Sequence, residues 1–164
     1  MNMKPALLIL AILMAATASA GDWSLSGGST VWQTLDGAED KAAVLEAAYD
    51  VAGWEAAAGH ISDQDGVGDY WYASGQKRAA HDFGPVEVFA GLGLAVRSHS
   101  EHVDYLLPSA VNFSLSGGVT VGSFRVTLRH LSNAGFRDPN RGQTWVIVGW
   151  LFGRDRQLSG ANDQ

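Results

Sequence analysis

The sequence has no cysteine and few charged residues. Without cysteine, it can carry neither a disulfide framework nor a lipid-modified cysteine. Charged residues make up 17% of the chain, whereas a water-soluble domain contains about a quarter. The formal net charge is -6 and no basic patch is present to neutralise phosphates, which argues against a nucleic-acid partner. We infer that something other than water covers part of the surface.

Long apolar runs are also missing, except at the start of the chain. Lys4 precedes an apolar run over residues 6–14, and Ala18-Ser19-Ala20 has the small-x-small pattern of a cleavage site. This pattern predicts a secretory signal peptide over residues 1–20 that is cleaved on export. No later stretch has the roughly 20 apolar residues of a membrane-spanning helix. The remainder, about 144 residues, fits one domain.

Glycine and aromatic residues are abundant instead, with 20 Gly, six Trp, six Phe and four Tyr. Breaks rich in Gly, Asp, Pro and Ser separate stretches with strand character. The second stretch, "KAAVLEAAY", contains good helix formers, but its alternation favours a strand. Lys77 and Arg78 fall in a predicted turn. The eight predicted strands cover residues 23–32, 43–51, 54–61, 70–76, 86–97, 110–121, 124–131 and 144–152.

Apolar side chains alternate with small or polar ones along nearly every predicted strand. In residues 86–97, Val88, Leu92 and Leu94 share one face, and Gly91 and Gly93 share the other. Two architectures have this pattern. A soluble sandwich or lipocalin-like barrel buries the apolar face. A transmembrane barrel turns the apolar face to lipid and encloses the polar one.

Three features favour the transmembrane barrel. Its polar face is rich in Gly and Ser, as a narrow barrel interior requires. The charges on that face are balanced, as an interior that must pair its ions requires: Glu46, Glu55 and Glu87 against Arg97, Arg125 and Arg129. Aromatic residues recur near strand ends, as in interfacial girdles: Trp23, Trp32, Trp54, Tyr70, Trp71, Tyr105, Trp145 and Trp150.

We therefore predict an all-β fold, an eight-stranded antiparallel transmembrane β-barrel of the outer membrane, over residues 21–152. A polar C-terminal tail over residues 153–164 follows, although an outer-membrane barrel more typically stops at its terminal aromatic, here Phe152. A soluble exported barrel that binds a small apolar ligand is the alternative architecture.

The stretch "RHLSNAG" ends the seventh predicted strand. His130 and Ser132 share parity with Leu128, so we expect both to face lipid, where a histidine is costly and therefore a functional candidate. Residues i and i+2 on one strand face lie roughly 6.5–7 Å apart, so a histidine ring can reach a serine hydroxyl as its general base. The glycine-containing turn beyond, with Asn133 and Asn140, offers N–H donors for an oxyanion. Interfacial polar residues that meet lipid headgroups are the alternative interpretation.

"RHLSNAG" followed by "PNRG" resembles the motif of the outer-membrane lipid A 3-O-deacylases, the PagL family. The close match covers about residues 129–142. The resemblance implies an eight-stranded barrel with a Ser-His-Glu triad that removes the 3-O-linked acyl chain of lipid A. Carried over by motif position, Ser132 is the nucleophile and His130 the base, and Asn133, Asn140 and the backbone around Gly135 are oxyanion candidates. It implies no metal and no organic cofactor.

The sequence departs from the family pattern at the third triad member. Counting forward from the motif puts the family's acid at Thr144, which cannot hold an imidazolium by charge. Its hydroxyl oxygen can still accept a hydrogen bond from Nδ1. Gln143, Asp138 and Glu101 are the fallback candidates.

The sequence therefore predicts a serine esterase that acts on lipid A in the outer leaflet of the bacterial outer membrane. The alternative is a non-catalytic barrel that binds lipopolysaccharide or reinforces the envelope. The expected partners are lipopolysaccharide and outer-membrane lipids, and a homodimer is left open. The stretch "HSEHVD" has no metal-site spacing and is interpreted as a solvated loop.

Overall fold

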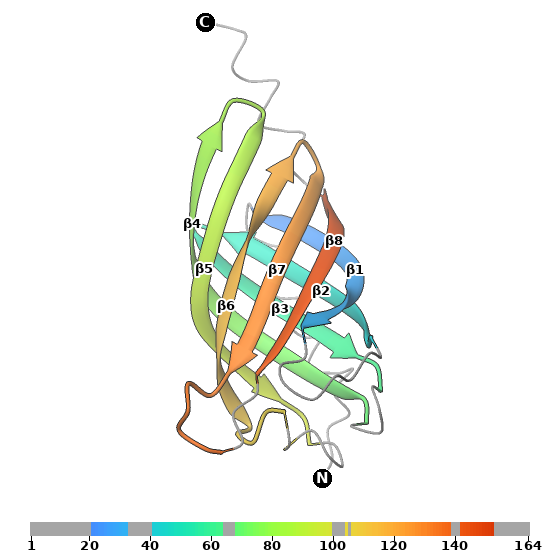
Figure 1. Cartoon of the computed structure of the whole chain (residues 1–164). Helices are drawn as coiled ribbons and strands as arrows, with labels where there is room; N and C mark the ends of the chain where they lie inside the picture. Colours follow the sequence, from blue (N-terminus) through green and yellow to red (C-terminus); the bar gives the residue numbers. More distant parts are fainter. Residues whose placement is uncertain are drawn as a thin grey trace, which may run out of the picture.

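The computed structural model describes residues 21–32, 41–63, 68–99, 104, 106–138 and 142–152. Every strand in this part of the chain pairs antiparallel with its neighbours, and β1 pairs with β8, so that the sheet closes on itself (Figure 1). The predicted eight-stranded barrel is thereby confirmed. The strands are β1 (Asp22–Trp32), β2 (Ala43–Val51), β3 (Trp54–Ile61), β4 (Tyr70–Phe83), β5 (Val86–Arg97), β6 (Val111–Val121), β7 (Phe124–Ser132) and β8 (Gln143–Phe152).

The two ends of the barrel differ in how the strands are joined. Two-residue turns connect β2 to β3, β4 to β5 and β6 to β7. These turns lie at one end, which we call the turn end. The longer connections lie at the opposite end, the loop end (Figure 1). No helix of the described residues is long and apolar enough to cross a membrane.

Strand β4 is longer than predicted. It was expected to end at residue 76, but pairing with β5 continues from Lys77, opposite Leu92, to Phe83, opposite Val86. The strand continues because no strong turn former occurs before the Gly-Pro pair at 84–85. The side chain of Arg78 also points inward, where it forms ion pairs. The predicted turn at Lys77 and Arg78 is wrong, and the longer β4–β5 hairpin projects at the turn end (Figure 1).

Exposure alternates along the strands as the sequence pattern predicts. In β7, the even-numbered residues face outward and the odd-numbered ones are buried. Large apolar side chains such as Leu25, Leu92 and Leu128 are exposed on the outer wall. Burying that wall in hydrocarbon removes the cost of exposing it to water, which is the arrangement of a membrane barrel.

The predicted aromatic girdle is partly wrong. Trp54, Trp71 and Trp150 are exposed on the outer wall, but Tyr70 and Trp145 are buried inside the barrel. Position near a strand end alone does not place a residue in a girdle, because its parity decides which face it occupies. Tyr105 and the side chain of Trp32 lie outside the described residues.

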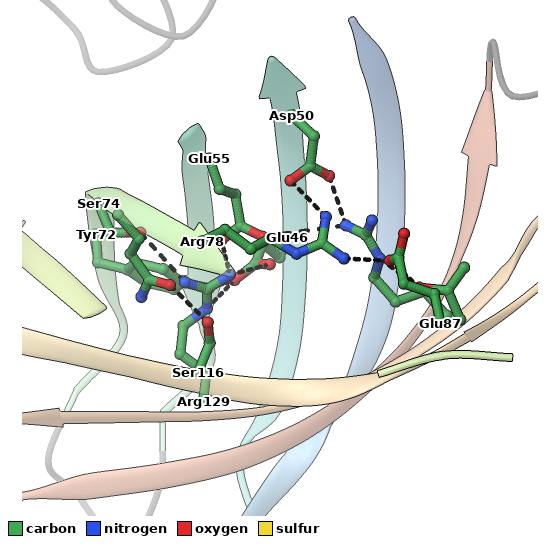
Figure 2. Close-up of polar contacts among 12 residues, drawn as sticks. Glu46, Asp50, Glu55, Tyr72, Ser74, Arg78, Glu87, Ser116 and Arg129 are labelled. Atoms are coloured by element: carbon green, nitrogen blue, oxygen red, sulfur yellow. Dashed lines mark hydrogen bonds and ion pairs between the residues drawn. The ribbon is translucent and has the colours of Figure 1, made fainter. Parts of the chain in front are cut away.

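The interior nearer the turn end holds a network of buried ion pairs. Arg129 lies between Glu46 and Glu55, at 2.9 Å and 2.7 Å, and its side chain is 0% exposed. Asp50 bridges two further guanidinium groups, at 2.9 Å from Arg78 and 2.6 Å from Arg125 (Figure 2). These contacts join β2, β3, β4 and β7 across the barrel, so that carboxylates and guanidinium groups compensate one another's desolvation.

The network differs in membership from the predicted set. Arg78, which was expected in a turn, also pairs with Glu87 at 2.6 Å. Arg97, which was expected to pair in the interior, instead pairs with Asp104 of the β5–β6 loop and donates from Nε to the Leu107 carbonyl at 2.9 Å. It therefore anchors a loop.

That loop closes the loop end of the barrel. Leu106 and Leu107 insert into an apolar cluster, and Trp145 packs on Tyr72 with ring centroids 5.1 Å apart. The interior is thus apolar towards the loop end and ionic towards the turn end. The cluster consists of Ala42, Val44, Ile61, Tyr70, Tyr72, Ala95, Leu106, Leu107, Leu131, Trp145 and Ile147.

Replacing Arg129 by alanine is expected to destabilise the barrel strongly. It leaves Glu46 and Glu55 buried without their shared cation, and removing one partner of a buried ion pair costs about 3–5 kcal/mol. Urea unfolding in detergent micelles, followed by tryptophan fluorescence, measures the change. Arg137→Ala, in an exposed loop, is the control and should stay within about 0.5 kcal/mol of the parent. Equal effects of the two substitutions would contradict a structural role for the Arg129 network.

Candidate active site

His130 and Ser132 lie at the carboxyl end of β7, at the loop end of the barrel. Both side chains are on the outer face and are partly exposed, whereas Arg129 and Leu131 point inward. This orientation is the one that strand parity predicts. Across the neighbouring strand β6, Leu115 pairs with His130. The histidine and serine therefore stand on an apolar outer wall.

Thr144 is the neighbour of His130 on β8. The two residues are register partners, and His130 Nδ1 lies 2.7 Å from Thr144 Oγ1. When Nδ1 carries the ring proton, it donates a hydrogen bond to the hydroxyl oxygen, and Nε2 keeps the lone pair that a general base needs. Within the described residues, no carboxylate forms an ion pair with the ring. Orientation of the ring thus comes from a neutral group.

Gly142 packs against the imidazole of His130. A Cβ atom at this position would lie 2.7 Å from Cε1 of the ring and 2.9 Å from the Leu131 carbonyl oxygen, and φ is +65°. A side chain is therefore excluded both by space and by backbone conformation. The Gly142 N–H also donates to the Leu106 carbonyl at 3.1 Å, which ties the site to the loop that closes the barrel.

A tight turn follows Ser132. The Ala134 N–H donates to Ser132 Oγ at 3.1 Å, and Ala134 has a φ of 54°, which is rare for a residue with a side chain. Asn133 is buried and holds the turn, since it accepts from the Gly135 N–H and donates to the Arg137 carbonyl, both at 2.9 Å. The oxyanion candidates Asn133 and Gly135 are therefore hydrogen-bonded to each other within the turn in this structure. Asn140 lies outside the described residues.

The fallback candidates for the acid lie in different surroundings. Gln143 faces the interior, where it accepts a hydrogen bond from the buried Tyr70 hydroxyl. It therefore lies on the inner side of the barrel wall, whereas His130 lies on the outer side. Asp138 is exposed in the β7–β8 loop. Glu101 lies outside the described residues. Of the three candidates within the described residues, Thr144 is the one that the structure brings to the ring.

Two phenylalanines flank the serine, and sequence reasoning assigned neither to the site. Phe113 pairs with Ser132 across β6 and β7, and its ring lies 6.2 Å from that of Phe136. Phe136 is 79% exposed in the β7–β8 loop. The outward parity of Phe113 could have been read from the sequence, but the contact between Phe136 and Phe113 depends on the loop conformation. Together they offer an apolar surface beside the hydroxyl.

Another histidine pairs with a carboxylate at the loop end. His60 Nε2 lies 3.0 Å from Asp69, and this hydrogen bond lowers the pKa of the exposed Asp69 carboxyl. The pair is exposed and remote in sequence from Ser132. Among the described residues, no group of three or more His, Cys, Asp or Glu side chains is arranged to hold a metal ion.

Comparisons with known proteins show the family of the chain and relatives of its fold. The model of a family described as lipid A 3-O-deacylase (PagL) matches residues 42–151. The fold resembles the crystal structure of the outer membrane enzyme PagL, with a TM-score of 0.54 and 20% identity over 80% of this chain and 98% of that one. It also resembles Neisserial surface protein A (NspA), with a TM-score of 0.55 and 9% identity over 80% of this chain and 94% of that one. No curated protein matches the sequence.

Replacing Thr144 by valine is expected to release the His130 ring. Valine keeps the shape of threonine but removes the oxygen 2.7 Å from Nδ1. The ¹⁵N NMR signals of the ring in micelles should shift towards a mixture of tautomers, and the barrel should lose only about 1 kcal/mol of stability. Unchanged ring signals would show that Thr144 does not orient His130. Val146→Thr, at the next outward position of β8, is the matched control.

Proposed function

Because the chain belongs to the lipid A 3-O-deacylase (PagL) family, we propose that it is a serine esterase that removes the 3-O-linked acyl chain of lipid A. The family and the barrel fold indicate the bacterial outer membrane as its location. In such barrels the long loops face outward and the short turns face the periplasm. The loop end, with His130 and Ser132, then lies at the level of the outer leaflet.

One observation carries the proposal: the histidine and the serine project from the barrel wall rather than into its interior. A soluble substrate has no reason to approach this wall, whereas the acyl chains of lipid A already lie along it. Phe113 and Phe136 offer apolar surface next to Ser132. An ester carbonyl at the leaflet surface can therefore reach the hydroxyl while its acyl chain stays in the hydrocarbon.

In the proposed mechanism, His130 Nε2 takes the proton of the Ser132 hydroxyl as Oγ attacks the ester carbonyl. The tetrahedral intermediate then expels the 3-hydroxyl oxygen of lipid A, which receives the proton from His130. A water molecule, deprotonated in turn by His130, attacks the acyl-enzyme. His130 returns this proton to Ser132 Oγ as the fatty acid leaves. Among the backbone N–H groups around Gly135, the candidate oxyanion donor is that of Ala134, which donates to Ser132 Oγ in this structure.

Thr144 sets the expected rate of this chemistry. In a serine protease, replacing the triad aspartate by asparagine lowers kcat about 10⁴-fold because the histidine adopts the wrong tautomer. A threonine hydroxyl can accept from Nδ1–H, so it keeps the useful tautomer and lacks only the charge that stabilises the imidazolium. We therefore propose a slow enzyme. The alternative, a barrel that binds lipopolysaccharide without hydrolysis, is favoured by the same neutral residue beside the ring.

Expression in a host with unmodified lipid A tests the activity. Mass spectrometry of lipid A should show loss of one hydroxyacyl chain, and Ser132→Ala should abolish that loss because it removes the nucleophile. Ser123→Ala, in the β6–β7 turn at the far end of the barrel, is the matched control and should retain activity. Intact lipid A in the presence of folded, membrane-inserted protein would reject the esterase and favour the binding role.

Thr144→Glu is expected to raise the rate by at least 10-fold, since a carboxylate beside Nδ1 stabilises the imidazolium that forms in the transition state. Thr144→Val should lower the rate. Initial rates on purified lipopolysaccharide in detergent, measured for the three proteins under one condition, provide the comparison. A rate that falls in both variants would show that Thr144 acts through its hydroxyl alone.

A further inference from the structure

A polar hollow at the turn end of the barrel lies far from His130 and Ser132. Its volume is about 290 Å³, and it opens between the start of β1, the β2–β3 turn and the projecting part of β4. Family membership assigns it no role. The lining residues are Gly21, Asp22, Asp50, Val51, Ala52, Gly53, Trp54, Arg78 and Ala80.

The charges of the lining do not balance. Among these lining residues, Asp22 and Asp50 contribute two carboxylates and Arg78 contributes one guanidinium group. Both oxygens of Asp50 are already paired, with Arg78 at 2.9 Å and with Arg125 at 2.6 Å, so Asp22 is the lining carboxylate that has no ion pair within the described residues. The two terminal nitrogens of Arg78 are already taken up by Asp50 and Glu87, at 2.9 Å and 2.6 Å. The hollow therefore has capacity for another small cation.

Of the two glycines that line the hollow, Gly21 has the tighter surroundings. A Cβ atom on it would lie 2.5 Å from the Asp50 carbonyl oxygen and 2.5 Å from the Tyr49 ring. Contacts this short exclude any side chain, so the backbone of residue 21 is held directly against β2. Gly21 is also the residue that follows the cleavage pattern Ala18-Ser19-Ala20.

We propose that the N-terminus formed by cleavage of the leader peptide binds in this hollow. Hydrolysis of the Ala20–Gly21 peptide bond by a leader peptidase consumes one water and converts the neutral Gly21 amide nitrogen into an α-ammonium group. That group binds in the hollow beside the carboxylate of Asp22. Before cleavage the same nitrogen carries no charge, so the hollow acquires its cation only when the leader is removed. Processing thereby fixes β1 against β2 at the periplasmic rim.

Chemical labelling of the purified protein in detergent tests the proposal. Mass spectrometry should first identify Gly21 as the N-terminal residue. N-hydroxysuccinimide acetate should then acetylate this α-amine at least 10-fold more slowly in the folded protein than in urea. The exposed side chains of Lys41 and Lys77 are internal references for reagent access. A different N-terminus, or equal labelling rates in the two states, would overturn the proposal.

Two substitutions separate the ion pair from the steric fit. Asp22→Asn should speed acetylation of the folded protein at least 3-fold. Gly21→Ala should do the same and lower the midpoint of urea unfolding, because its methyl group displaces the terminus from Tyr49 and Asp50. Gly27→Ala is the control in the same strand, since a Cβ there meets nothing closer than 3.6 Å.

Should Gly21→Ala fail to be processed, the mature variant can be refolded from inclusion bodies and labelled in the same way. An α-amine that stays protected in either Asp22→Asn or Gly21→Ala would reject the proposed binding site. Neither result depends on whether the protein hydrolyses lipid A.

Discussion

The constraint on which the structure depends is that backbone N–H and C=O groups find no partners in hydrocarbon. Pairing of β1 with β8 satisfies it, since a closed sheet has no free edge along its membrane-spanning part. Closure also forces every strand to have one face inside and one face in lipid. The alternation of small or polar with large apolar residues follows from that geometry, and so does the low content of charge.

Closure creates an interior too narrow for water-filled space, and the chain fills it in two ways. Towards the loop end, Leu106 and Leu107 fold back among aromatic and aliphatic side chains. Towards the turn end, Arg129 and Arg125 are surrounded by carboxylates from strands that are distant in the sequence. Such buried pairs are costly to desolvate, so their value lies in holding specific strands opposite one another rather than in a large net free energy.

The wall on which the candidate site stands is a consequence of the same alternation. A histidine and a serine with outward parity meet lipid, whereas the same pair with inward parity would be sealed inside the barrel. The proposed esterase therefore needs no pocket to select its substrate, because in this proposal the membrane itself presents the ester. The contact between Thr144 and the His130 ring is neutral, so it supplies no charge to the imidazole.

By itself, the sequence determined the number of strands, the alternation of their two faces, and the placement of both His130 and Ser132 on the outer face of one strand. These follow from a period of two, which is local. The tertiary structure decided which residues of different strands meet: Thr144 with His130, Arg78 with Asp50, and Gln143 with Tyr70. It also decided that β4 continues past residue 76 and that Gly142 closes over the imidazole. Contacts of this kind depend on strand register and loop conformation, which are set by interactions between segments far apart in the chain.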